Sequence, residues 1–306
     1  MKVAKIIATC FAKRNFRPKS YLVGDPLGYF GHSQTFSSPK EILDLIKFNI
    51  LIEKKINPGV EKRDLIIVNN DVGYKKGNNF LKKISGTKIP FGKIITCNRK
   101  NIGMSFGAYD HAFKKYRAKY DFFLFTEDDT VICKDNYFKT GIDIFKSVKN
   151  AGFLAYIHST KVGNEYFRAL NLNKKNAISC HGATGLTSQI LLKRIFKKYG
   201  KLPHYEGNNY KKCITYGEVA FPNSFVKMGY KIIDLPKDLI LTIPACDLMK
   251  GIRYKKWPNI LEKIIFYLKA YAYKIFSLSS YSLELYLKLL KSLKKNRFFT
   301  YEQFRK

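Results

Sequence analysis

The chain has 306 residues, of which 46% are hydrophobic and 15% aromatic. That length and composition predict one large domain or two small ones with a sizeable core, and they exclude a disordered protein. Because 56 Lys and Arg stand against 23 Asp and Glu, the formal net charge is +33, which predicts attraction to nucleic acid, an anionic membrane surface or phosphorylated ligands.

The cysteines and the N-terminus indicate a cytoplasmic, reducing environment. Six cysteines lie far apart, without a C-x-x-C pair or a cluster with histidine, so free thiols are expected rather than a zinc site. The opening MKVAKIIATCF has a short apolar run that Lys5 interrupts and no small-residue cleavage site, and it predicts a first strand. No run of about 18 uncharged apolar residues occurs, so no transmembrane helix is expected.

The first half of the chain alternates strand-like and helix-like segments. The segment 39–56 repeats apolar residues at three and four positions, and Ser37 or Ser38 is a suitable N-cap for it. A βαβαβαβ order favours a mostly parallel sheet with helices on its faces. The expected elements are strands over 3–10, 65–71, 93–97 and from 122, and helices over 39–56, over 105–116 and ending at 84.

The run LIIVNND ends one predicted strand in Asn69, Asn70 and Asp71, whose short polar side chains suit hydrogen bonds to a base or ribose. The next stretch, RKNIGMSFGAYDHA, opens a helix where glycines allow close approach of the backbone and the N-terminus favours an anion. An ordinary turn is the alternative in both places. The residues singled out at this helix start are Asn101, Gly103, Ser105 and Gly107.

The run FFLFTEDDTVI at 122–132 ends another predicted strand in three acids. Its continuous apolar stretch is typical of a strand buried on both faces. The acids Glu127, Asp128 and Asp129 follow at the carboxyl end, which is where open α/β sheets bind ligands. The alternatives are a solvated loop and a helix N-terminus, which also favours acids.

A nucleotide sugar gives these acids a chemical role. Negative charge grows on the diphosphate leaving group as the glycosidic bond breaks, and a divalent cation that bridges the phosphates offsets this charge. Mg²⁺ and Mn²⁺ take carboxylate oxygens and keep positions open for phosphate and water. The acid run therefore predicts Mn²⁺ or Mg²⁺ as the cofactor.

The series IIATC, LIIVNND, NIGMSFG and FFLFTEDD resembles the donor-binding half of GT-A fold glycosyltransferases, in particular family 2-like enzymes with an N-x-G-x-S helix start and a DxD metal motif. The resemblance covers about 3–135 and, less closely, 180–235. It implies an α/β, GT-A-like (Rossmann-like) fold with a mostly parallel sheet and flanking helices. It also implies transfer of a sugar from a nucleotide-diphosphate sugar to an acceptor hydroxyl.

Carried over to this sequence, the resemblance implies that Asp129 ligates the metal and that Asp128 contacts donor ribose or metal-bound water. Both are metal candidates, and Asp128 is also a donor-binding candidate together with Glu127, the first acid of the motif. Thr9 is a donor-binding candidate, although ATCF stands here where the family usually has P-T-Y-N. The remaining donor-binding candidates are Asn69, Asn70, Asp71, Asn101, Gly103 and Ser105.

The second half predicts an acceptor site and a catalytic base. CHGATGLTSQILLKRIF suggests a glycine-rich loop before an amphipathic helix, and ITYGEVAFPNSFVKMGYKIIDLP places Glu218 at the start of a helix ending near Gly229. Inverting transfer needs a carboxylate to take the proton of the acceptor hydroxyl, and Glu218 is the candidate. Its alternative is a first-turn acid favoured by the helix dipole. Asp247 is a further candidate for the metal shell or the acceptor.

After Trp257 the chain repeats basic amphipathic patterns rich in Tyr and Phe. These helices either pack on the catalytic domain or lie in an anionic leaflet, which suits a cell-surface glycan or a lipid-linked acceptor. The expected organisation is a catalytic domain over 1–256, with a donor-binding half over 1–135 and an acceptor half over 136–256, and a tail over 257–306.

These patterns together predict a glycosyltransferase of bacterial surface polysaccharide or lipopolysaccharide synthesis, peripheral on the inner face of the cytoplasmic membrane. One rival is a nucleic-acid-binding protein, but the basic residues are dispersed and no RNP, KH or zinc signature occurs. Another is a non-catalytic membrane scaffold, which explains the tail and leaves the acids without a role.

Overall fold

The structure is a computed structural model that describes residues 1–12, 38–132, 134–156, 158–159, 164–172, 177–236 and 239–242. The predicted tail over 257–306 and the candidate Asp247 lie outside the described residues. Within the described ranges, no helix has the length and apolar character needed to cross a membrane.

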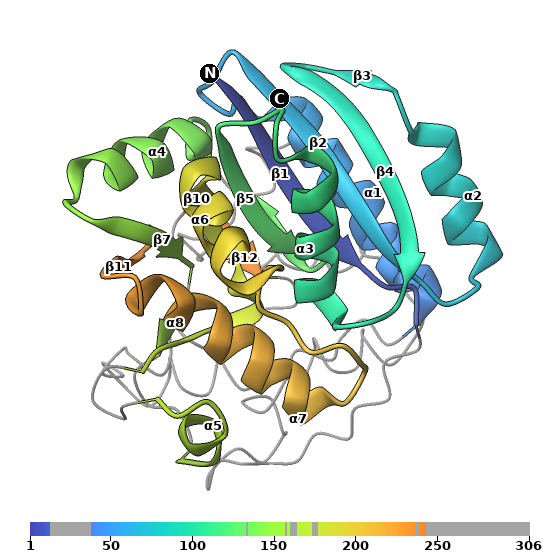
Figure 1. Ribbon diagram of the computed structural model, residues 1–306. Helices are drawn as coiled ribbons and strands as arrows, with labels where there is room; N and C mark the ends of the chain where they lie inside the picture. The colour runs from blue at the N-terminus through green and yellow to red at the C-terminus, as the bar shows by residue number, and fades with distance from the viewer. Residues whose placement is uncertain are drawn as a thin grey trace, which may run out of the picture.

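The middle layer is an eight-stranded sheet (Figure 1). Its strands are β1 (Lys2–Thr9), β2 (Lys62–Asp71), β3 (Lys88–Ile89), β4 (Gly92–Lys100), β5 (Phe122–Glu127), β7 (Ala151–Ala155), β10 (Gly185–Ser188) and β11 (Lys231–Asp234). They lie in the order β11-β7-β10-β5-β1-β2-β4-β3. β5, β1, β2 and β4 pair in parallel, as do β7 and β11, whereas β10 is antiparallel to both neighbours and β3 to β4. The mostly parallel sheet predicted from the sequence is confirmed.

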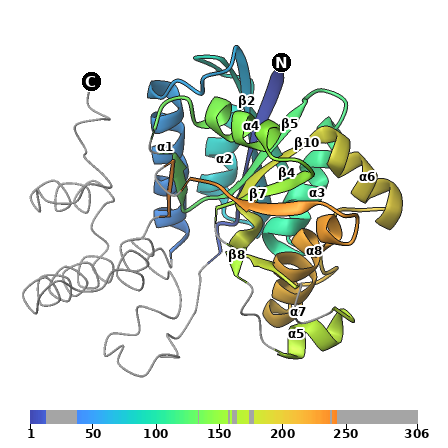
Figure 2. The same cartoon turned by 90° about the vertical axis from the view of Figure 1, so that its left-hand side faces the viewer.

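Helices cover both faces of this sheet (Figures 1 and 2). One face packs against α1 (Pro39–Lys55), α2 (Lys75–Ile84) and α4 (Tyr137–Ser147), and the other against α3 (Met104–Tyr116), α6 (Gln189–Tyr199) and α8 (Ala220–Val226). The smaller elements are β6 (Thr130–Ile132) paired with β12 (Ile240–Thr242), β8 (His158–Ser159) paired with β9 (Ser179–Cys180), α5 (Asn164–Ala169), a short turn at His181–Ala183, α7 (Tyr210–Cys213) and a π-helical segment at Ile214–Val219.

Strand β5 shows why a continuous apolar run forms a central strand. Phe123 and Phe125 pack in the cluster that contains α3, α6 and α8. Phe122 and Leu124 point to the opposite face and pack with residues of α1 and α4. Because successive side chains alternate between two covered faces, the four positions from Phe122 to Phe125 are all apolar.

The helices and strands predicted for the first half all occur, with ends within three residues of the prediction. In the second half, the stretch CHGATGLTS was expected to be a loop, and this is wrong because it contains β10. A Cβ atom at Gly185 would lie 2.1 Å from the carbonyl oxygen of Leu154. Strand β10 therefore needs a glycine at position 185. The strand was missed because a glycine in a sequence ordinarily indicates a break in a strand.

The predicted start of a helix at Glu218 is also wrong. Asn209 caps the helix earlier, since its side chain accepts the Lys212 backbone N–H at 3.1 Å. From Tyr210 the chain stays helical through α7, the π-helical segment and α8. Glu218 lies inside the π-helical segment, a geometry that is rare and often found at functional sites.

A fully buried charge cluster joins α1 to the sheet. Glu53 of α1 accepts a hydrogen bond from Lys5 of β1 at 2.8 Å and from Tyr137 at 2.9 Å, and it forms an ion pair with Arg63 of β2. The side chains of Lys5, Glu53 and Arg63 have no exposed area. The carboxylate of Glu53 thus forms ion pairs with two buried cations, Lys5 and Arg63.

We expect Glu53→Gln to lower the free energy of unfolding by about 3–5 kcal/mol, because it removes the carboxylate charge that pairs with both Lys5 and Arg63 and leaves these buried cations in place. Urea denaturation measures the change. Glu61→Gln, at an exposed position, is the control and is expected to change stability by less than about 0.5 kcal/mol. Equal stabilities of the two variants would contradict the prediction.

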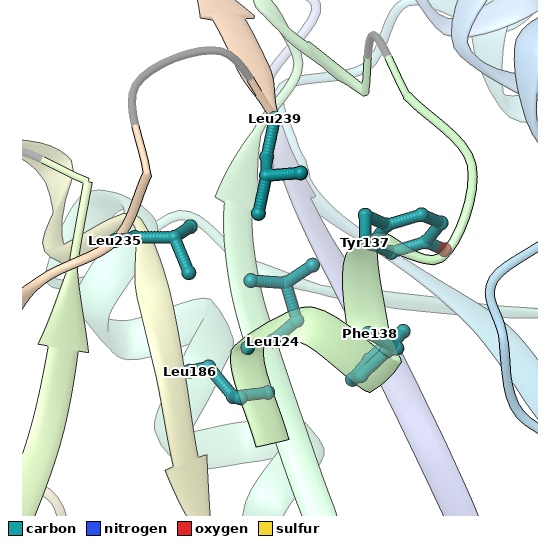
Figure 3. Close-up of a pocket in the computed structure, with 7 residues that line it drawn as sticks. Leu124, Tyr137, Phe138, Leu186, Leu235 and Leu239 are labelled. Carbon is teal, nitrogen blue, oxygen red and sulfur yellow. The ribbon is translucent and has the colours of Figure 1, made fainter. Parts of the chain in front are cut away.

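A small apolar cavity lies between α4 and the sheet (Figure 3). Gly141 of α4 borders it, and a Cβ atom there would lie 3.0 Å from Leu186 Cδ2 and 3.5 Å from Leu235 Cδ1. The cavity gives those leucines room to shift. Its lining residues are Leu124, Tyr137, Phe138, Gly141, Leu186, Leu235 and Leu239.

We expect Gly141→Ala to stabilise the protein by about 0.5–1 kcal/mol, because alanine favours the helix and its methyl group enters the cavity. Thermal or urea denaturation tests this. Gly77→Ala in α2 is a matched control with the opposite expected sign, since its Cβ atom would lie 2.5 Å from the ring of Phe11. A loss of stability in Gly141→Ala would show that Leu186 cannot move.

Candidate active site

Four parallel strands end at one edge of the sheet, which Figure 1 shows in the lower half of the molecule. Across this edge, Thr9 of β1 stands beside Asn69 of β2, and Asn69 beside Asn98 of β4. On the other side of β1, Ala8 stands beside Glu127 of β5. The chain continues from β1 to β2 on one side and returns as β5 on the other, and such a switch point is where α/β sheets bind ligands.

Asp128 is held from both sides at this switch point. The Thr9 hydroxyl donates to Asp128 Oδ2 at 2.9 Å, and the Asn49 amide of α1 donates to the Asp128 carbonyl oxygen at 2.9 Å. Asp128 is 1% exposed and Asp129 8% exposed. The alternative of a solvated loop is therefore wrong for these two aspartates. Two buried carboxylates, consecutive in the sequence, thus lie at the switch point, and carboxylate oxygens are the ligands that hard divalent cations take.

Glu127 points toward α3 and the turn at His181–Ala183. The Ser105 hydroxyl donates to Glu127 Oε1 at 2.5 Å, and a Cβ atom at Gly182 would lie 2.5 Å from Glu127 Oε2. The backbone N–H of Gly182 donates to Glu218 Oε1 at 3.4 Å. The structure thus brings the candidate base to the same turn as the acid run, although 91 positions separate Glu127 from Glu218 in the sequence.

Tyr109 of α3 lies among these carboxylates. Burial raises the pKa of Tyr109 well above its ordinary value, and the negative charges of Glu127, Asp129, Asp128 and Glu218 raise it further. The phenol therefore stays protonated, and it donates a hydrogen bond to the Gly182 carbonyl oxygen at 3.0 Å.

On the opposite side of β1, amide side chains form a second group. Asn69 Nδ2 donates to Asn78 Oδ1 at 2.9 Å and to Asn98 Oδ1 at 3.2 Å. Arg99 donates to Asn70 Oδ1 at 2.5 Å. Asn69 Oδ1 is buried and accepts no hydrogen bond from the part of the chain that the structure describes. A ligand N–H group would satisfy it.

Asp71 marks the outer end of this group. Its Oδ1 accepts hydrogen bonds from the Asn78 amide at 2.9 Å and from the Gly73 N–H at 2.8 Å. These bonds, that of Asn78 first, lower the pKa of Asp71 below its ordinary value. The carboxylate is therefore charged at neutral pH and held in one orientation.

The start of α3 contributes the remaining candidates. Gly103 has a left-handed backbone, with φ of 73°, and its N–H donates to the Gly207 carbonyl oxygen at 2.8 Å. Asn101 Nδ2 lies 3.7 Å from Cys10 Sγ, just beyond β1. Ser105 reaches Glu127, as described above. Segment 204–207 thus lies over the start of α3. The Gly103 N–H, which was expected to face an anion, instead donates to the backbone of this segment.

The donor atoms at the switch point fit a hard divalent cation. Asp128 and Asp129 offer adjacent carboxylates, and Mg²⁺ is commonly held by one or two carboxylates together with substrate phosphates and water. Among the described residues, no group of three or more His, Cys, Asp or Glu side chains has metal-binding geometry. Asp128 and Asp129 are therefore the two carboxylates that could hold such a cation here.

Three residues that complete the site were absent from the sequence-based list: Asn49, Tyr109 and Gly182. Asn49 interrupts the apolar repeat of the 39–56 helix, and that polar residue on an apolar face was the available signal. Tyr109 and Gly182 gave none, because their roles come from a contact between segments 73 residues apart.

No family model matches the chain, and no curated protein matches it. The fold is similar to a mannosyltransferase from Pyrobaculum calidifontis in complex with GDP-Man and Mn²⁺, at 11% identity and a TM-score of 0.46 over 95% of this chain and 79% of that one. It is also similar to a cytidylyltransferase from Leptospira borgpetersenii, at 15% identity and a TM-score of 0.41 over 89% and 96%. A third is S. aureus TarS 1–349, at 14% identity and a TM-score of 0.39 over 96% and 79%. The likeness concerns the fold alone.

Proposed function

We propose that the protein is a glycosyltransferase that moves a sugar from a nucleotide-diphosphate sugar to an acceptor hydroxyl. The observation that carries the proposal is the pair of buried carboxylates, Asp128 and Asp129, at the switch point of a mostly parallel sheet. The amide group around Asn69 lies on one side of them and Glu218 approaches on the other. A donor nucleotide and an acceptor thus each have polar partners.

In this proposal each group of residues at the site has a separate role in the reaction. Asp128 and Asp129 hold Mn²⁺ or Mg²⁺, and the cation when bound offsets the charge that grows on the diphosphate. The Thr9 hydroxyl and the Asn49 amide keep Asp128 in place. Asn69, Asn70 and Asp71 orient the nucleoside. Glu218 takes the acceptor proton in an inverting transfer.

The acceptor we propose is a cell-surface glycan or a lipid-linked molecule, met at the inner face of the cytoplasmic membrane. The support is the net charge of +33, which attracts the chain to anionic lipid headgroups. No nucleic acid is expected as partner. A gel shift with nucleic acid at physiological ionic strength, weakening as salt rises, would support the rival function instead.

A donor screen tests the proposed function directly. UDP-, GDP-, CMP- and dTDP-sugars are incubated with the full chain with Mn²⁺, with Mg²⁺ or with EDTA, and hydrolysis and thermal stabilisation are measured. We expect one nucleotide class to be hydrolysed slowly and to raise the melting temperature only with metal. Pyrophosphate release from a nucleoside triphosphate and a sugar phosphate, without turnover of any nucleotide sugar, would indicate a nucleotidyltransferase and overturn the proposal.

A further inference from the structure

The turn at His181–Ala183 lies between the two glutamates of the site. Its backbone N–H at Gly182 donates to Glu218, and the space where a side chain would stand at Gly182 is taken by the carboxylate of Glu127. The backbone is left-handed at Gly182, with φ of 55°, and also at Ala183, with φ of 43°. Such a conformation is unfavourable for alanine and persists only where its surroundings enforce it.

Tyr109 provides that enforcement. Its hydroxyl donates to the Gly182 carbonyl oxygen at 3.0 Å within the protein interior. The ring is 1% exposed and packs against Phe125 and Phe106, with centroids 4.8 and 5.8 Å away. Helix α3 and strand β5 therefore fix the hydroxyl, and through it the position of the turn.

We propose that Tyr109 and Gly182 are positioning residues for transfer: Tyr109 holds the turn through the Gly182 carbonyl, and the Gly182 N–H holds the carboxylate of Glu218 where the acceptor hydroxyl arrives. The inference rests on the proposed role of Glu218 as the base. The Tyr109 hydroxyl donates to the Gly182 carbonyl oxygen and not to Asn69, so the amide group that we assign to the nucleoside does not depend on that hydroxyl. Loss of Tyr109 or Gly182 moves the base and slows proton acceptance.

Tyr109→Phe tests the inference, because it keeps the ring and removes only the hydroxyl. We expect kcat for transfer to fall by about 10-fold and by no more than the 10² that a misplacement of 1 Å can cost. Donor affinity, measured by metal-dependent thermal stabilisation, is expected to stay at the parent value. Tyr120→Phe is the matched control, since its buried hydroxyl donates to Asp64 at 2.7 Å at the opposite edge of the sheet.

A second pair of variants covers the case in which Tyr109→Phe does not fold. Gly182→Ala and Gly200→Ala both place alanine at a left-handed position, but only the first meets Glu127, and nothing lies within 4 Å of the second. We expect Gly182→Ala alone to lose transfer. Equal kcat in Gly182→Ala and Gly200→Ala would overturn the inference.

The outcomes also separate this inference from the proposed function. If Glu218→Gln transfers sugar at the parent rate, the base assignment fails and the positioning role fails with it. If Glu218→Gln is inactive while Tyr109→Phe keeps the kcat of Tyr120→Phe, only the positioning role is overturned. A fall in kcat confined to Tyr109→Phe and Gly182→Ala, with parent donor affinity in Tyr109→Phe, supports it.

Discussion

Asp129→Ala is expected to abolish metal-dependent turnover of the donor without lowering the stability of the metal-free protein. Asp129 follows the end of strand β5 and belongs to none of the apolar clusters that pack on the sheet, so shortening it takes no side chain out of those clusters. The same change leaves a single carboxylate of this pair to hold the metal. Hydrolysis of the donor across an Mn²⁺ titration, together with urea denaturation in EDTA, measures both effects.

Asp143→Ala is the control for this experiment, because Asp143 is an exposed acid on α4 whose recorded partner is Lys139. We expect it to keep parent activity and stability. Asp129→Asn keeps the shape of the side chain and is expected to be as inactive as Asp129→Ala. Parent turnover in either Asp129 variant would remove Asp129 from the metal site.

The first half of the fold was predictable because its signals are local. Strand β5 is buried on both faces, so its apolar run stands out without knowledge of its neighbours. Helix α1 shows its apolar repeat for the same reason. Strand β10 was missed, because Gly185 is required by the close approach of the Leu154 carbonyl from a neighbouring strand. Sequence patterns carry no record of such a distant backbone contact.

The candidate site divides in the same way. The polar ends of β2 and β5 were predictable, since parallel strands bring their carboxyl ends to one edge. Their burial was not, because it depends on the Thr9 hydroxyl and on Asn49 reaching over from α1. The π-helical setting of Glu218 was also missed, since the capping residue Asn209 lies nine positions earlier. The acids themselves are visible in one short stretch of sequence, whereas Thr9 and Asn49, the groups that orient Asp128, come from distant parts of the chain.

Glu218→Gln is expected to lower the rate of transfer by about 10² to 10⁴ and to leave donor affinity unchanged, because an amide cannot accept the acceptor proton but fills the same space. Glu218 is half-buried, and the amide oxygen of glutamine can still accept the Gly182 N–H, so the turn is retained. Transfer is followed with saturating donor and acceptor, and donor affinity by metal-dependent thermal stabilisation.

Glu206→Gln is the control, since this exposed glutamate pairs with Lys201 outside the acid cluster and is expected to keep the parent rate. Parent transfer in Glu218→Gln would move the base to another carboxylate, whereas a parallel loss of donor affinity would assign Glu218 to the donor site.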